Sequence, residues 1–180
     1  GVVSVRSRWR QYEGFELVND VGGGSFGTVR ESAALLGRWG DWDLAAGLNI
    51  LKTDGHRDGA GGSNWVGQIA TRWRPSCRFD VTIRDRVAHL EGADPGTVTH
   101  PFADHWYDVW RNTASVVATY RHNALEIRAV PYLNVGVHRL YDGFASTDYN
   151  GGGFLDARVQ LDDLGELLVG VGATWTDGTV

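Results

Sequence analysis

Apolar and polar residues alternate along most of the chain from about residue 12 onward. Because successive side chains of a β-strand point to opposite sides, a repeat of two residues predicts strands with two unlike faces. The longest example covers residues 125–138. Its first face is apolar and carries Leu125, Ile127, Ala129, Pro131, Leu133, Val135 and Val137. Its second face carries Glu126, Arg128, Tyr132, Asn134 and His138.

This alternation, with the turn residues between its segments, predicts about nine strands. They cover residues 12–21, 25–38, 41–53, 64–74, 77–90, 106–121, 125–139, 148–161 and 165–176. Strands of soluble domains usually have about five or six residues, whereas a tilted strand needs about 9–11 residues to cross a bilayer. We therefore predict an all-β fold: an antiparallel up-and-down meander of about nine long strands that is part of a transmembrane β-barrel.

The predicted connections alternate in length. Short connections lie at 38–41, 74–77, 122–124 and 162–165, and longer ones lie at 54–63, 91–105 and 140–147. In an up-and-down meander every second connection lies at the same end of the sheet. Outer-membrane barrels have this asymmetry, with short turns on the periplasmic side and longer loops outside the cell.

Aromatic residues gather near both ends of the predicted strands. Beside the short turns lie Trp39, Trp42, Trp73, Phe79 and Tyr120. Toward the longer loops lie Trp65, Trp106, Tyr107, Trp110, Tyr141, Phe144, Tyr149 and Trp175. Two aromatic belts on either side of an apolar band are typical of a barrel in lipid.

The height of the apolar face and the charge of the other face also favour a membrane wall. At about 3.4 Å per residue and a tilt near 45°, the apolar row of residues 125–137 is roughly 30 Å tall. The opposite faces carry charged residues that a dry core would not accommodate, namely Arg72, Asp80, Arg84, Arg128, Asp156 and Arg158. Three residues fit the pattern poorly: Pro131 lies within a strand, and Asp85 and His89 lie on an apolar row.

Composition narrows the class of protein further. The chain has 180 residues, 25 of them glycine, which argues against a helical bundle. The net charge is −5 and no basic patch is present, so we expect no nucleic-acid partner. Cys77 is the single cysteine, which excludes an internal disulfide. Gly1 is not a translation start and the chain has no methionine, so we expect a mature or truncated piece of a longer protein.

Four stretches, in order along the chain, resemble the TonB-dependent outer-membrane receptors. Residues 1–8 (GVVSVRSR) are similar to the last strand of that family's plug domain, with Ser4 in place of the usual Asn. Residues 22–28 (GGGSFGT) are similar to the glycine-rich first barrel hairpin. Residues 40–43 (GDWD) with 52–58 (KTDGHRD) resemble the third strand and its loop, and 141–149 (YDGFASTDY) resemble a loop of some members.

The resemblance implies a division of the chain and a function. Members have a plug domain inside a barrel of 22 strands, and they import scarce ligands such as ferric siderophores or cobalamin with energy from the TonB complex. Residues 1–10 are then expected to be the end of the plug and its link, and 11–180 the first, incomplete part of the barrel. The implied location is the bacterial outer membrane. The implied partners are outer-membrane lipid, a small nutrient complex, and TonB through an N-terminal region that the sequence does not include.

No motif for catalysis is present, and we expect no enzymatic activity, no resident metal and no cofactor. The sequence has no Gly-x-Ser-x-Gly and no His-Glu-x-x-His. Ligand contacts are expected from aromatic side chains and an arginine near the long loops, since these groups can hold a planar or anionic chelate. The candidates are Trp106, Tyr107, Trp110, Arg139, Tyr141 and Phe144.

Two other interpretations stay open from the sequence. The first is a small passive outer-membrane barrel of eight strands, acting as a pore, adhesin or structural protein, which requires the first and last strands to pair. The second is a soluble carbohydrate-binding β domain, which requires a dry interior and solubility without detergent.

Overall fold

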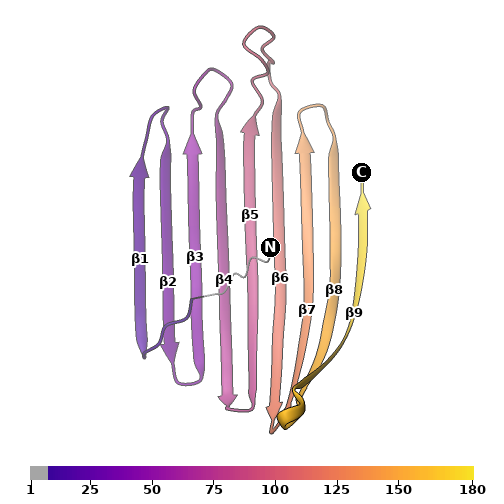
Figure 1. The fold of residues 1–180 in the computed structure, drawn as a ribbon. Helices are drawn as coiled ribbons and strands as arrows, with labels where there is room; N and C mark the ends of the chain where they lie inside the picture. The colour runs from indigo at the N-terminus through magenta and orange to yellow at the C-terminus, as the bar shows by residue number, and fades with distance from the viewer. Residues whose placement is uncertain (1–7) are drawn as a thin grey trace.

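The computed structural model describes residues 8–180, and in them the fold is a single antiparallel sheet of nine strands (Figure 1). The strands are β1 (Gly14–Gly23), β2 (Val29–Trp39), β3 (Trp42–Thr53), β4 (Gly62–Ser76), β5 (Phe79–Ala93), β6 (Trp106–His122), β7 (Leu125–Leu140), β8 (Ala145–Gln160) and β9 (Glu166–Thr179). A short 3₁₀ turn, η1 (Asp162–Leu164), precedes β9. Each strand pairs with the next along the chain, so the predicted all-β meander of about nine long strands is confirmed.

Successive connections lie at alternate ends of the sheet, as predicted, but one of them is shorter than predicted. Residues 40–41, 77–78, 123–124 and 161–165 join strands at the lower end in Figure 1, and residues 24–28, 54–61, 94–105 and 141–144 join them at the upper end. We call these the turn end and the loop end. The predicted long loop at 140–147 is wrong, because β8 begins at Ala145 and leaves only 141–144 unpaired. Ala145, Ser146 and Thr147 have no apolar pattern, but they pair with Arg139, His138 and Val137.

The register places the two kinds of side chain on opposite faces of the whole sheet. Trp42 of β3 lies opposite Trp39 and Trp73, and the next residue, Asp43, lies opposite Arg38 and Arg72. Directly paired residues share a face, so the apolar rows of neighbouring strands join into one surface. The polar rows join into the other.

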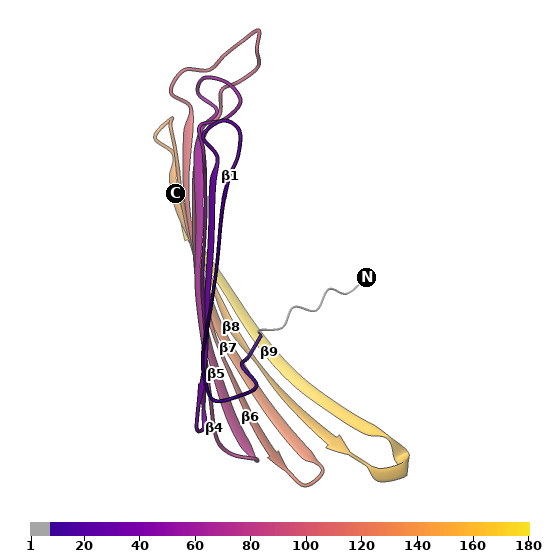
Figure 2. The same cartoon turned by 90° about the vertical axis from the view of Figure 1, so that its left-hand side faces the viewer.

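The sheet is curved, and its polar face is the concave one. Residues 8–13, here called the strap, cross one side of the sheet before β1 begins. In Figure 2 the lower ends of β6–β9 sweep toward that side. The guanidinium of Arg38, on the polar face, donates hydrogen bonds to the backbone oxygens of Gln11 at 3.0 Å and Arg10 at 3.4 Å. The strap therefore lies on the concave, polar face.

The predicted turn-end belt forms on the convex face, and the loop-end belt forms there in part. Tyr107 points to the concave face, and Tyr141 and Phe144 lie in the loop 141–144. At the turn end the rings of Trp42 and Trp73 stack with centroids 5.8 Å apart, and Phe79 meets Trp73 edge-on at 6.4 Å. At the loop end Trp65 and Trp110 meet edge-on at 5.4 Å. Between the belts the convex face is mostly apolar, as the alternation predicts.

Pro131 is accommodated in β7 by a local gap in hydrogen bonding. β6 pairs with β7 from the loop end as far as Ser115↔Tyr132. Pairing resumes at Ala118↔Ala129 without a shift in register. Proline has no N–H to donate, which explains an interruption at this place. On its other side Pro131 pairs with Gly153 of β8.

The sheet is open within the described residues. Its edges are β1 and β9, which pair only with β2 and β8 in the part of the chain that the structure describes. The ring that the eight-stranded hypothesis requires is not formed there, and closure into a larger barrel stays a prediction. The predicted plug-derived strand at 1–8 lies, apart from Arg8, outside the described residues.

Candidate functional site

The six predicted ligand contacts all lie near the loop end, but they do not face one way. Trp106 and Trp110 of β6 and Arg139 of β7 are on the convex face, because they share rows with Ala93, His89 and Asp108. Tyr107 is on the concave face, in the row of Gly92 and Leu140. Tyr141 and Phe144 bound the short loop 141–144. No single concave site gathers all six, and their role in ligand contact stays a prediction.

The convex-face members belong to a polar and aromatic cluster at the loop-end belt. The imidazole of His89 stacks on Trp110 with centroids 4.1 Å apart, and its Nε2 lies 2.7 Å from the carboxylate of Asp108. Arg139 lies 3.9 Å from the second oxygen of the same carboxylate. This places His89, which fits the apolar row poorly by sequence, at the belt rather than in the apolar band.

Trp106 and Tyr107 also line a hollow where β3–β6 meet their loops. Its volume is about 620 Å³, and its charged and hydroxyl lining includes Lys52, Asp54, Ser63, Glu91 and Asp108. Most of these groups are on the convex side, since Ser63, Glu91 and Asp108 share one row there. The role of Trp106 and Tyr107 in ligand contact therefore stays a prediction.

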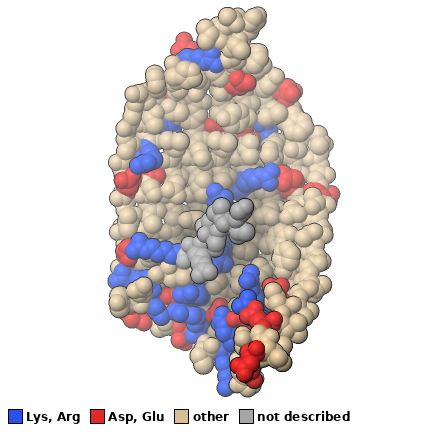
Figure 3. All heavy atoms as spheres, viewed as in Figure 1, with Lys and Arg blue, Asp and Glu red and all other residues tan. Residues whose placement is uncertain are grey.

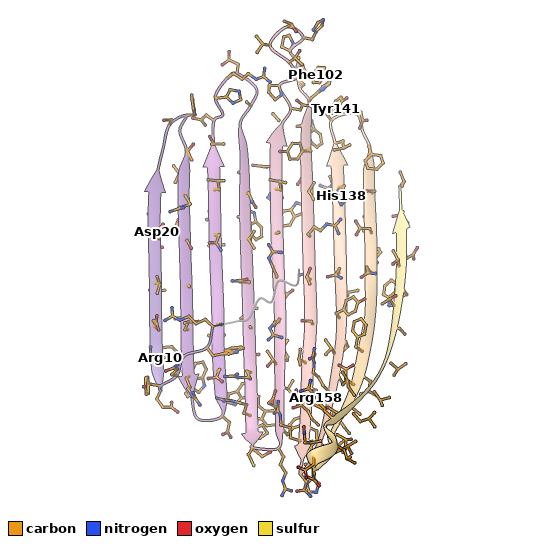
Figure 4. The ribbon with its side chains drawn as sticks, viewed as in Figure 1. Arg10, Asp20, Phe102, His138, Tyr141 and Arg158 are labelled. Atoms are coloured by element: carbon orange, nitrogen blue, oxygen red, sulfur yellow. The ribbon has the colours of Figure 1, made fainter. Side chains whose placement is uncertain are left out.

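Tyr141 instead takes part in a stack that joins two loops. The ring of His105 lies 3.7 Å from that of Tyr141 and 4.2 Å from that of Phe102, so the loop 94–105 rests on the start of the loop 141–144. Figure 4 shows Phe102 and Tyr141 close together above the strands. Backbone pairing adds to the contact, since the N–H of Tyr141 donates to the oxygen of Trp106 at 3.0 Å.

We expect the Tyr141→Ala variant to loosen the loop 94–105. An aromatic pair is worth about 1 kcal/mol beyond its buried area, so amide hydrogen exchange in Phe102–His105 should become about five- to tenfold faster. Phe144→Ala is the matched control, because Phe144 lies in the same short loop but outside the stack. Equal effects of the two substitutions would contradict the role assigned to the stack.

Sequence reasoning missed a charged cluster on the concave face. Arg111 of β6 donates to both carboxylate oxygens of Asp148 of β8, at 3.1 and 3.4 Å. His138 of β7 lies between them, with its Nε2 at 3.1 Å from Arg111 and 3.3 Å from Asp148. The alternation places each of these residues on the polar face, but only the register between three strands brings them together.

The row below this cluster is also lined with hydrogen-bonding groups. The amide of Asn134 donates to Asn150 at 3.2 Å, and the amide of Asn150 donates to the hydroxyl of Thr176 at 3.0 Å. Figure 3 shows the concave face, where the basic side chains gather over the lower half of the sheet. A face with this many charged and amide groups needs water or a polar partner against it.

Asp85 is the residue that fits the apolar convex face least. It lies between the belts, opposite Ile69 and Ala114, and its carboxylate accepts a hydrogen bond from the amide of Asn112 at 2.7 Å. The carboxylate is thus partnered rather than left bare on an apolar surface, which lowers the cost of placing it there.

A double-mutant cycle tests this pair. In lipid, Asn112→Leu should lower the free energy of unfolding by about 1–3 kcal/mol, because the Asp85 carboxylate loses its donor in an apolar band. The double variant Asp85→Leu with Asn112→Leu should return close to the parent value, since both partners are replaced by apolar groups. Urea titration of the protein folded in vesicles gives both numbers. An additive cycle would show that the two side chains do not depend on each other.

Comparison with known proteins gives one structural likeness. No protein-family description matches the sequence, and no curated protein matches it. The fold is similar to that of a solved structure described as "Copper transporter OprC", with a TM-score of 0.42 and 11% sequence identity. The match covers 96% of this chain and 42% of that one. At this level the likeness carries no inference about function.

Within residues 8–180, no group of three or more His, Cys, Asp or Glu side chains is placed to hold a metal ion. No helix of the described residues is long and apolar enough to cross a membrane.

Proposed function

We propose that this chain is a wall segment of a TonB-dependent outer-membrane receptor that imports a scarce nutrient complex, such as a ferric siderophore or cobalamin. The observation that carries the proposal is the curved sheet with two unlike faces. Its convex face is apolar between two aromatic belts, and its concave face is polar and carries the strap. An outer-membrane barrel needs an apolar exterior and tolerates a polar interior.

In this proposal the convex face, the concave face and the loop end of the sheet have different roles. The convex face contacts lipid, and the concave face lines an interior in which a plug and a passing ligand are accommodated. The hollow beside Trp106 and Tyr107 and the cluster of Arg111, His138 and Asp148 offer hydrogen bonds and charges toward the loop end. The segment acts in transport without catalysis of its own, in the bacterial outer membrane, and with energy from TonB through a preceding region.

The test uses the complete reading frame that contains this sequence, expressed in cells with and without TonB. We expect the protein to fractionate with the outer membrane and to require detergent for extraction. Growth on one chelated nutrient should depend on both the protein and TonB. Recovery in the soluble fraction without detergent would instead favour the carbohydrate-binding alternative. Uptake that is independent of TonB would favour a passive barrel.

A further inference from the structure

Asp43 on β3 is the most enclosed side chain of the described residues. It is 1% exposed, and no other residue described in the structure has a side chain buried to that degree. Its position, next to the two-residue turn 40–41, is one where a strand end would ordinarily be open to solvent. Its burial therefore requires neighbouring side chains that cover the carboxylate on the concave face.

Three guanidiniums surround the carboxylate. Arg72 contacts one oxygen through two nitrogens, at 2.8 and 2.9 Å, and Arg74 contacts the same oxygen at 2.9 Å. Arg38 approaches the other oxygen at 3.7 Å. One negative charge on β3 thus holds three positive charges of β2 and β4 close together, and without it they would repel one another.

Two of these guanidiniums also hold the strap. Arg38 donates to the backbone oxygens of Arg10 and Gln11, and Arg72 lies under the ring of Trp9 at 4.6 Å from its centroid. A cation against the face of a tryptophan is attracted by the ring, more so when water is excluded. The same two arginines thus connect the buried carboxylate to the strap.

Acidic residues of the N-terminal part complete the attachment. The carboxylate of Glu13 accepts a hydrogen bond from the N–H of Gly40 at 2.9 Å, and Glu16 pairs with Arg8 at 2.9 Å and Arg10 at 3.6 Å. These contacts lie at the edge of the cluster and are more exposed than Asp43. They depend on the strap already lying in place.

We propose that Asp43 is the centre of an anchor that fixes the strap to the concave wall at the turn end. Asp43 is a positioning residue: it does not touch the strap through a bond of its own, but it holds Arg38 and Arg72 where they bind Gln11 and Trp9. Any chain that precedes residue 8 is tethered at this point of the wall. The anchor does not rest on the proposed transport function, because every contact in it lies within residues 8–74.

Trypsin cleavage after Arg10 reports the state of the strap in the complete chain. In the parent protein Arg10 is held against the wall, so we expect slow cleavage. We expect Asp43→Asn, which keeps the side-chain volume and removes the charge, to speed this cleavage at least tenfold. Arg38→Gln should give an intermediate rate, since it removes the bonds to the strap oxygens but leaves Asp43 with Arg72 and Arg74. Asp20→Asn is the matched control and should change the rate less than twofold, because it breaks an exposed ion pair with Arg30 on β1 and β2.

Distances between spin labels separate release of the strap from damage to the wall. With Cys77→Ser as background, one pair of labels joins position 12 in the strap to position 113 in β6, and a second pair joins positions 29 and 113 in the wall. In Asp43→Asn the first distance should broaden while the second stays unchanged. If both distances change, the substitution distorts the wall rather than releasing the strap, and if neither changes the strap is held by other contacts. Either result overturns the proposal.

Discussion

Replacing Leu133 by arginine is expected to lower the free energy of unfolding in lipid by about 2–4 kcal/mol, the cost of a basic residue at the middle of the bilayer on the outer face of a barrel. Leu133 lies on the convex face of β7, opposite Ala114 and Gly151 and between the two aromatic belts. Neither Ala114 nor Gly151 has a side-chain acceptor for the guanidinium, so it must displace lipid or extend toward a belt. Urea titration of the protein folded in vesicles measures the change.

The neighbouring residue provides the control for this substitution. Asn134 is on the concave face, where its amide donates to Asn150, so Asn134→Arg should cost about 1 kcal/mol, the value of one lost hydrogen bond. The two substituted positions are adjacent in sequence, but position 133 is on the convex face and position 134 is on the concave face. If both cost the same, the convex face does not contact lipid. A soluble protein would show little effect at Leu133, whose side chain is 39% exposed.

The strands could be predicted from sequence because both faces of each strand have a clear character. Residues 125–138 alternate over most of their length, with Val130 the apolar residue on the polar face, and β7 begins at Leu125 as expected. The start of β8 was missed because Ala145, Ser146 and Thr147 carry no alternation, and only pairing with β7 makes them a strand. The local sequence does not determine a strand boundary that depends on pairing with a neighbouring strand. It does show the alternation of faces along a strand.

The candidate site was harder to predict than the fold, for a physical reason. Trp106 and Tyr107 were chosen by residue type and nearness to a loop, yet successive residues of a strand face opposite sides. The cluster of Arg111, His138 and Asp148 depends on the register of three strands, which no local pattern fixes. Asp43 was noted only as part of a motif, because its burial depends on the strap that covers it.

Replacing Asp43 by asparagine is expected to lower the free energy of unfolding by about 3 kcal/mol. Removing one partner from a buried ion pair costs about 3–5 kcal/mol, because the remaining charges are left uncompensated. The low end applies here because the side chains of Arg38, Arg72 and Arg74 are 22–33% exposed and water can solvate part of their charge. Asp20→Asn, which breaks an exposed pair, should cost about 0–1 kcal/mol.

A cycle with Arg72→Gln distinguishes charge pairing from packing as the source of this effect. In Asp43→Asn the three guanidiniums repel one another because the carboxylate is gone. If Asp43 acts through its charge, the additional change Arg72→Gln relieves part of this repulsion by removing one guanidinium. The double variant should then cost less than the sum of the single variants, with a coupling of about 1–3 kcal/mol, as is found for groups in one network. If Asp43 acts only by filling space beneath the strap, Asp43→Asn should be nearly neutral and the coupling close to zero. The sign and size of the coupling therefore decide whether the most buried side chain of the described sheet is there for its charge.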